Sequence, residues 1–234
     1  MRLRAAQLPL QTRPPGRRVS RRRASAPSAR SATPTALERS WPQLAALGGP
    51  LGAAALLAAR RRLDRERALA LSGLAVLMCH QIEEWVWPDG FGAWMNRTVL
   101  RSRSDRWPLT PARACAVNVY AGWGSSAAAA LLVKRAPLLQ AALAGSHLSN
   151  AALHLLYALR ERRWNPGALT AGALLLPWGA AALWQPLRRG HLTAPQALLG
   201  AAVGGASLPA LIGRMRSEAA RDRRARRTCR RRVR

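Results

Sequence analysis

The chain has 234 residues and a formal net charge of +28, and 49% of its residues are hydrophobic. Its length fits one domain or one helical bundle with tails. Nearly all of the positive charge is arginine, which gathers at the two ends and in the short gaps between long apolar segments. Positive residues that flank apolar segments are typical of membrane proteins, so this distribution argues against a specific nucleic-acid-binding function. The three cysteines form no CxxC motif, which argues against a disulfide framework and against a cysteine-ligated zinc site.

Arginine-rich tails lie on either side of the apolar part of the chain. Residues 1–39 combine Arg, Pro, Ser and Ala without apolar periodicity, so we expect them to be disordered. A start codon assigned too far upstream is the alternative explanation. Residues 214–234 form a second tail, which we expect to be helical at most in part. The charge of both tails is expected to orient the protein and to attract anionic lipid headgroups.

Between the tails, residues 40–213 contain six apolar segments. These are Trp41–Ala59, Leu69–Trp87, Thr110–Val133, Pro137–Leu159, Asn165–Trp184 and Thr193–Ile212. Each of the last five has close to the 20 or so residues that a helix needs to cross a bilayer, whereas the first is short and rich in glycine. The predicted fold is therefore an all-α, polytopic membrane bundle of about six (five to six) transmembrane helices. The sequence does not predict an oligomeric state.

Several helix ends have recognisable signals. Ser40 and Gln43 have the spacing of a capping box, which predicts the start of the first segment. Thr110 followed by proline is an N-cap and first-turn pair for the third segment. Pro177 lies inside the fifth segment, where it should kink the helix.

The second segment contains the sequence His80–Glu84, which reads His-Gln-Ile-Glu-Glu. Residues three and four apart share one face of a helix, so Glu83 and Glu84 flank the face that carries His80. A charge at the centre of a membrane helix costs roughly 2.5–3.5 kcal/mol, and such residues are functional candidates by default. Placement of the two carboxylates at the membrane interface is the simpler alternative.

The fourth segment supplies a second polar group. His147, Asn150 and His154 are spaced three and four apart, and so lie on one helix face. One span separates the second and fourth segments, so both cross in the same direction, and His80 and His154 should lie within roughly 8–10 Å of the same interface. Asn118, near the start of the third segment, falls at a similar depth. We therefore predict one polar layer that holds all of these groups.

The motif at residues 80–84, followed by Asn150-x-x-x-His154 in a later apolar helix, resembles the HXXEE-motif family. This is a group of small polytopic membrane proteins, mostly bacterial, of unknown function and suspected enzymatic character. The resemblance covers about residues 69–212. It implies that the family's His and Glu-Glu are those at positions 80, 83 and 84, and that its later Asn and His are Asn150 and His154.

Neutral imidazoles together with carboxylates suit zinc, iron or manganese. Without a metal, a His–Glu pair can still act as general acid and base. The predicted catalytic or metal-binding residues are His80, Glu83, Glu84 and His154. The predicted supporting or cofactor-binding residues are Asn150, His147 and Asn118. For His147 alone, a hydrogen bond between helices is the simpler interpretation.

Three functions remain open. The leading hypothesis is an integral membrane enzyme with a His/Glu site near one face, acting on a lipid-like substrate. The first alternative is a carrier of protons or metal ions, because intramembrane His and Glu residues also serve as relay groups. The second is a scaffold whose polar layer only holds helices together.

Six spans would place both tails, the loop 89–110 and the polar layer on the cytoplasmic side of the cell membrane. The five arginines of Arg60–Arg67 would then face outward, against the positive-inside rule. Five spans would turn this gap inward, but would leave the two tails on opposite sides.

Overall fold

The computed structural model describes residues 33–232. Within this range the chain is helical, and the one pairing of extended backbone is an isolated bridge between Ser104 and Trp107. The predicted all-α fold is therefore confirmed. Residues 1–32 of the predicted N-terminal tail lie outside the described part of the chain.

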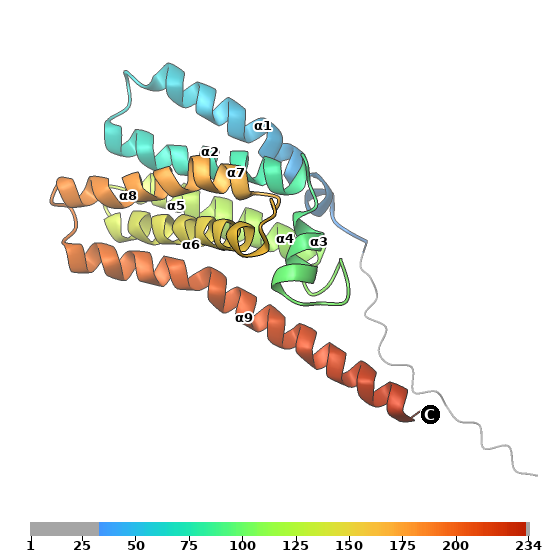
Figure 1. Ribbon diagram of the computed structural model, residues 1–234. Helices are drawn as coiled ribbons and strands as arrows, with labels where there is room; N and C mark the ends of the chain where they lie inside the picture. Colours follow the sequence, from blue (N-terminus) through green and yellow to red (C-terminus); the bar gives the residue numbers. More distant parts are fainter. Residues whose placement is uncertain (1–32, 233–234) are drawn as a thin grey trace, which may run out of the picture. The chain divides into compact units, whose positions relative to one another are not determined.

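Helical stretches occupy the positions of all six predicted segments (Figure 1). Four of them are single helices: α1 (Ala36–Ala59), α2 (Arg65–Trp85), α6 (Pro137–Glu161) and α9 (Ala194–Arg232). The third combines α4 (Pro111–Cys115), a π-helical stretch (Ala116–Trp123) and α5 (Gly124–Leu132). The fifth combines α7 (Ala168–Thr170), a π-helical turn (Ala171–Leu175) and α8 (Leu176–Arg188). Between α2 and α4 lie α3 (Phe91–Trp94) and a further π-helical turn (Met95–Val99).

The first helix begins earlier than the sequence predicts. Thr35 is its N-cap, and Thr35 and Glu38 form a complete capping box in which each side chain accepts a hydrogen bond from the other residue's backbone N–H. The predicted box at Ser40 and Gln43 is wrong, because the Ser40 hydroxyl donates instead to the carbonyl of Ala36 inside the helix. The reciprocal pair satisfies two backbone donors at once, which explains why the helix starts there.

The structure differs from two further predictions, one about the end of α9 and one about the kink at Pro177. α9 continues to Arg232, so the C-terminal tail is helical far beyond the partial helix that was expected. Near Pro177, where a kink was predicted, Ala171–Leu175 form a π-helical turn directly before α8. Proline has no N–H to donate, so the regular α-helical hydrogen bonding on its N-terminal side is interrupted.

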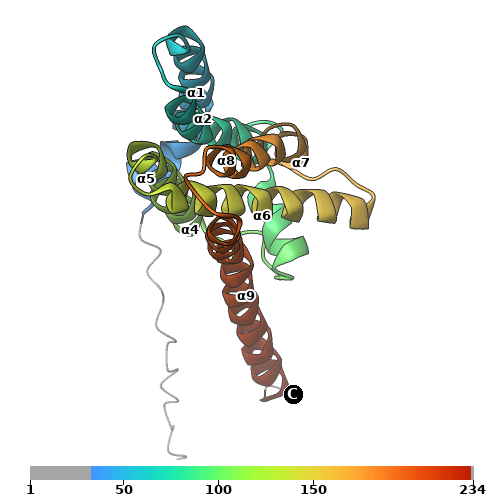
Figure 2. The same ribbon diagram turned by 90° about the vertical axis from the view of Figure 1, so that its left-hand side faces the viewer.

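The helices pack mainly as neighbours in two pairs. α1 lies along α2, as Figures 1 and 2 both show, and α9 packs against α6, which it crosses at the angle seen in Figure 2. The second pair is unusually close, because a Cβ atom added to Gly204 would lie 1.7 Å from the carbonyl oxygen of Ala142. Likewise, a Cβ on Gly145 would lie 2.0 Å from the carbonyl oxygen of Ala201. Small residues that let two backbones approach in this way are typical of helix pairs in membranes.

One hydrophobic cluster joins the helix ends near the predicted polar layer. It contains Trp41 at the start of α1, Phe91 of α3, Cys115 at the end of α4 and Met215 in the arginine-rich part of α9. Trp85, the last residue of α2, packs edge-on against Trp41 with ring centroids 5.2 Å apart. The start of α1, the end of α2 and the arginine-rich part of α9 therefore meet at the same end of the helical bundle.

Two described helices are long and apolar enough to cross a membrane, namely α1 and the stretch Ala194–Arg226 of α9. The predicted bundle of six spans is not supported by this finding. α2 and α6 contain the polar residues of the candidate site, and π-helical stretches divide the runs 111–132 and 168–188 into shorter helices. Most of the apolar surface of the two candidate spans is exposed, for example Leu51 (67%) and Leu198 (70%).

Candidate functional site

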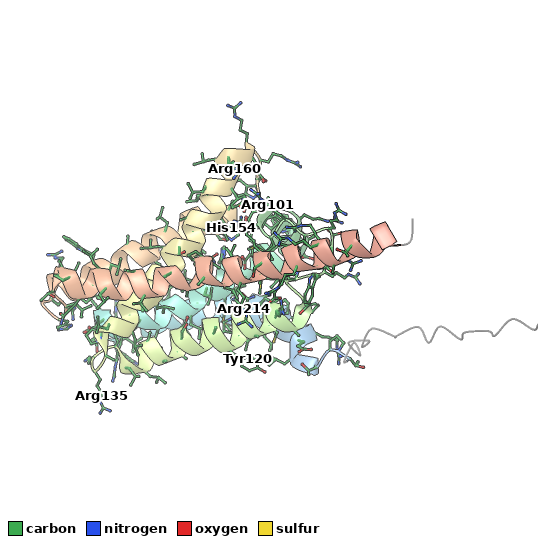
Figure 3. The ribbon with its side chains drawn as sticks, turned by 90° about the horizontal axis from the view of Figure 1, so that it is seen from below. Arg101, Tyr120, Arg135, His154, Arg160 and Arg214 are labelled. Atoms are coloured by element: carbon green, nitrogen blue, oxygen red, sulfur yellow. The ribbon has the colours of Figure 1, made fainter. Side chains whose placement is uncertain are left out.

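Two helices bring His80, Glu84 and His154 together. One ligand-type atom from each residue lies within 4.8 Å of the others. Oε1 of Glu84 is 3.4 Å from Nε2 of His80 and 3.2 Å from Nε2 of His154. The predicted approach of the two histidines is confirmed, since their ring centroids are 5.0 Å apart. All three residues are buried, and Figure 3 shows His154 among the helices, whereas Arg160 of the same helix points away.

The helical spacing explains this convergence. His80 and Glu84 are one turn apart on α2, so their side chains point the same way, toward α6. The other carboxylate oxygen of Glu84 accepts a hydrogen bond from the indole N–H of Trp85 at 3.2 Å. That bond leaves Oε1 for the two imidazole rings.

Asn165 determines which nitrogen of His154 carries a proton. Its amide nitrogen donates to the backbone carbonyl of His154 at 2.9 Å, which sets the orientation of the amide. The amide oxygen then faces Nδ1 of the same histidine at 2.7 Å and must accept its N–H. Because neutral imidazole carries one N–H, Nε2 of His154 presents a lone pair toward Glu84.

Thr170 determines which ring nitrogen of His80 carries the proton. The Thr170 hydroxyl donates to the carboxylate of Glu83 at 2.6 Å, so its oxygen accepts the N–H of His80 Nδ1 at 2.8 Å. Nε2 of His80 is thereby left as an acceptor, and the amide of Asn150 donates to it at 3.2 Å. Partners of this kind, which fix the tautomer and orientation of a histidine ring, are characteristic of metal-binding histidines.

The resulting arrangement has an excess of acceptors. Nε2 of His154 is buried and has no hydrogen-bond partner, although Oε1 of Glu84 lies 3.2 Å away. The contact is thus close without being aligned as a hydrogen bond. With neutral rings, the lone pair of His154 Nε2 and Oε1 of Glu84 repel each other unless a metal ion, or a proton on the imidazole, lies between them. Burial strengthens this repulsion because little solvent screens it.

Glu83 occupies a different place from the other motif residues. Its carboxylate accepts hydrogen bonds from the indole N–H of Trp164 and the backbone N–H of Leu169, each at 3.2 Å. It also accepts from the backbone N–H of Thr170 at 2.8 Å and from the Thr170 hydroxyl. Glu83 therefore supports His80 through Thr170, and its oxygens are taken up by Trp164 of the α6–α7 connection and by two residues of α7.

Gly167 closes the space beside the two rings. Its φ is +103°, and an added Cβ would lie 2.5 Å from Cε1 of His154 and 3.0 Å from Cε1 of His80. On another side, the indole of Trp94 stacks on the His154 ring, with centroids 5.6 Å apart and an 18° angle between the planes. The site is thus enclosed by backbone and aromatic surface.

The other predicted residues are divided between the site and its surroundings. Asn150 contacts His80 through the amide hydrogen bond to Nε2. Asn118 is not beside the two rings but accepts a hydrogen bond from the amide of Gln81 at 2.9 Å. His147 lies two turns before His154 on α6, where its ring contacts Trp178 with centroids 4.6 Å apart.

Sequence reasoning misses three residues of the site: Asn165, Gly167 and Thr170. The sequence marks Asn165 only as the first residue of the fifth apolar segment, directly before Pro166. Its side chain instead bonds His154, eleven residues earlier. No spacing pattern could have found these contacts, because they depend on the conformation of the α6–α7 connection. The one available signal was a glycine with polar residues around the start of a helix, since Asn165 and Gly167 precede α7 and Thr170 ends it.

Residues 71–182 match the family described as "Protein of unknown function with HXXEE motif". This part of the chain is an HXXEE-motif domain. The domain contains all three converging residues and also Asn165, Gly167 and Thr170, whereas α1 and α9 lie outside it. The match is shorter than the predicted resemblance over residues 69–212. No curated protein and no solved structure matches the chain.

Proposed function

We propose that the HXXEE-motif domain binds one divalent transition-metal ion through Nε2 of His80, Nε2 of His154 and Oε1 of Glu84. The observation that carries the proposal is the unpartnered, buried Nε2 of His154, whose lone pair faces a carboxylate. In a tetrahedral site with bonds of about 2.0–2.1 Å, neighbouring ligand atoms lie about 3.3–3.4 Å apart. The two distances to Glu84, 3.4 and 3.2 Å, fit this spacing.

The ligand set narrows the choice of metal. Two histidines and one carboxylate form the protein ligands of catalytic zinc sites and of non-haem iron(II) oxygenases, and both leave positions open for water or substrate. Manganese fits less well, because it prefers sites richer in oxygen ligands. A bound ion of this kind would act as a Lewis acid and would activate coordinated water or oxygen. We propose on this basis a metal-dependent enzyme.

Asn150 has a specific place in this proposal. Its amide donates to the lone pair of His80 Nε2, which the metal would need. The amide would have to give up this hydrogen bond for a metal to bind at Nε2, and it would remain close to the ion. There it can donate a hydrogen bond to a metal-bound water or to a substrate oxygen.

We also propose that the domain lies in the cell membrane. Exposed leucines such as Leu47 (64%) and Leu51 cover α1, and contiguous apolar surface of this extent marks a membrane or protein contact. α1 packs along α2 and α9 packs against α6, so each site-bearing helix lies beside one of the two candidate spans. A multi-pass protein with its site near one interface, acting on a lipid-like substrate, agrees with this arrangement.

The arginine distribution supports a cytoplasmic position for the site end. The loop 89–110 and the arginine-rich part of α9 belong to this end, and they contain many more arginines than the short turns at the other end. We propose that these arginines contact anionic lipid headgroups. Reporter fusions at Arg67 and Arg234 test the orientation, with an external signal expected at Arg67 and a cytoplasmic signal at Arg234.

One observation favours a second candidate, a carrier of protons or metal ions. His147 and Gln140 are buried on the same face of α6 as His154, and Nε2 of His147 and both amide atoms of Gln140 have no partner. These residues extend polar groups about 21 Å along the helix, at 1.5 Å per residue. Metal-ion or proton flux into liposomes that contain the purified protein would distinguish this function from an enzyme.

Metal analysis of the purified full-length protein tests the main proposal. We expect about one zinc or iron ion per chain in the wild type and a loss of bound metal in His80→Ala, Glu84→Gln and His154→Ala. His191→Ala is the matched control, because His191 contacts Glu66 at the start of α2, away from the site. Equal metal content in all of the variants would contradict the proposal.

A further inference from the structure

The connection between α6 and α7 passes directly over the candidate metal site. We call residues 162–170, which comprise this connection and α7 itself, the strap. It contains Asn165, which bonds His154, Gly167, which packs against both imidazole rings, and Thr170, which bonds His80. A metal ion or a substrate could therefore not reach the site from this side without displacing the strap.

One side chain outside the strap holds much of it in place. The carboxylate of Glu83 accepts hydrogen bonds from the strap's Trp164, Leu169 and Thr170. Hydrogen bonds to a charged acceptor are stronger than those between neutral groups. Glu83 belongs to α2, so these bonds connect the strap to the helix that carries His80 and Glu84.

Two backbone positions let the strap turn sharply. Its first residue, Arg162, has a φ of +49°, and Gly167 has a φ of +103°. Residues with positive φ allow the chain to change direction, and a non-glycine residue there stores strain. Trp164 is 62% exposed, so its one polar contact with Glu83 is made at the surface of the bundle.

We propose that the strap is a movable cover over the metal site and that Glu83 is the latch that keeps it closed. Glu83 is then a positioning residue rather than a metal ligand. It acts on the site through the strap and through the Thr170–His80 contact. Opening of the strap would let the metal, and later the substrate, reach the open position beside Asn150. This inference rests on the proposed metal site, and it assigns the first residue of the Glu-Glu pair a separate role.

The rate of metal transfer tests the latch. The full-length protein is loaded with zinc, and the release of zinc to an excess of a chromogenic chelator is followed for wild type, Glu83→Ala and Glu83→Gln. We expect all three to bind one zinc ion, with at least tenfold faster release from Glu83→Ala and an intermediate rate from Glu83→Gln. Glu161→Ala is the matched control, because Glu161 is an exposed carboxylate on the last turn of α6 next to the strap. Its rate should equal that of the wild type.

A second measurement does not depend on metal. Amide hydrogen exchange of the metal-free protein should show lost protection in Glu83→Ala at Leu169 and Thr170, whose N–H groups donate to Glu83. Protection in α9 should be unchanged. Wild-type release and exchange rates in both Glu83 variants would overturn the latch. If Glu83→Ala does not fold, Glu83→Gln alone decides the question. Absence of metal from the wild type, with strap exchange still dependent on Glu83, would refute the metal site and leave the latch standing.

Discussion

The close fit of Gly167 against the two imidazole rings gives a sharp prediction for Gly167→Ala. The new Cβ would lie 2.5 Å from Cε1 and 2.9 Å from Nδ1 of His154, and 3.0 Å from Cε1 of His80. Carbon atoms in ordinary contact are about 3.5–4.0 Å apart. The His154 ring must therefore move by about 1 Å, or the strap must lift by the same amount.

Such a displacement is large for a metal site, because productive ligand geometry tolerates about 0.5 Å. We expect the zinc dissociation constant of Gly167→Ala to rise at least tenfold, which corresponds to about 1.4 kcal/mol. The substitution also forces a non-glycine residue to a φ of +103°, at a cost of about 1–3 kcal/mol in folding stability. Both effects are measurable, by competition with a chelator of known affinity and by thermal unfolding.

Gly190→Ala is the control that separates the loss of zinc affinity from the loss of folding stability. Gly190 also has a positive φ, +68°, but a Cβ added there would meet no atom within 4 Å. It should lose stability through its backbone alone and keep the wild-type affinity for zinc. If Gly167→Ala binds zinc as tightly as Gly190→Ala does, the rings do not pack against the strap as described, and the reasoning is refuted.

Three further predictions follow from the packing and the site. Gly204→Ala should lower the thermal unfolding temperature strongly, because its Cβ would lie 1.7 Å from a backbone oxygen of α6. Gly213→Ala is the control and should leave the unfolding temperature unchanged, because its Cβ would meet no atom within 4 Å. Asn165→Leu should weaken metal binding about 10–100-fold while leaving the helical circular dichroism unchanged, because His154 loses the partner that orients it. Metal affinity should fall as the pH is lowered from 8 to 5, since only neutral imidazole binds metal. A chelator titration at each pH measures this affinity, and an affinity that does not change with pH would argue against histidine ligands.

The sequence predicted the helices well, because long apolar segments separated by arginine and proline leave few alternatives. The same segments predicted the approach of His80 and His154. Two helices separated by one crossing run in the same direction, so the two histidines, each near the C-terminal end of its segment, lie at a similar depth. Thr35 was missed as the start of α1 because its capping box precedes the apolar segment. The number of candidate spans was overestimated, because segment length alone ignores the polar residues of α2 and the π-helical breaks near Pro177.

The surroundings of the site could not be predicted in the same way. Thr170 contacts His80 across ninety residues of sequence, through a strap whose path depends on positive φ values. Neither apolar periodicity nor motif spacing contains this information. The sequence grouped Glu83 with Glu84 because both lie within about one turn of His80, although neighbouring positions on a helix differ by about 100° in direction. That rotation directs one carboxylate to the strap and the other to the two histidines.

X-ray absorption spectroscopy of the metal-loaded full-length protein tests the central claim most directly, because it reports the ligand atoms around the ion. The proposed site predicts two imidazole nitrogens at about 2.0–2.1 Å and carboxylate or water oxygens at about 2.0–2.2 Å, with no sulfur. The multiple-scattering signal of imidazole in the wild type should correspond to two rings. A sulfur ligand at about 2.3 Å, or a first shell of oxygen alone, would contradict the site built from His80, Glu84 and His154.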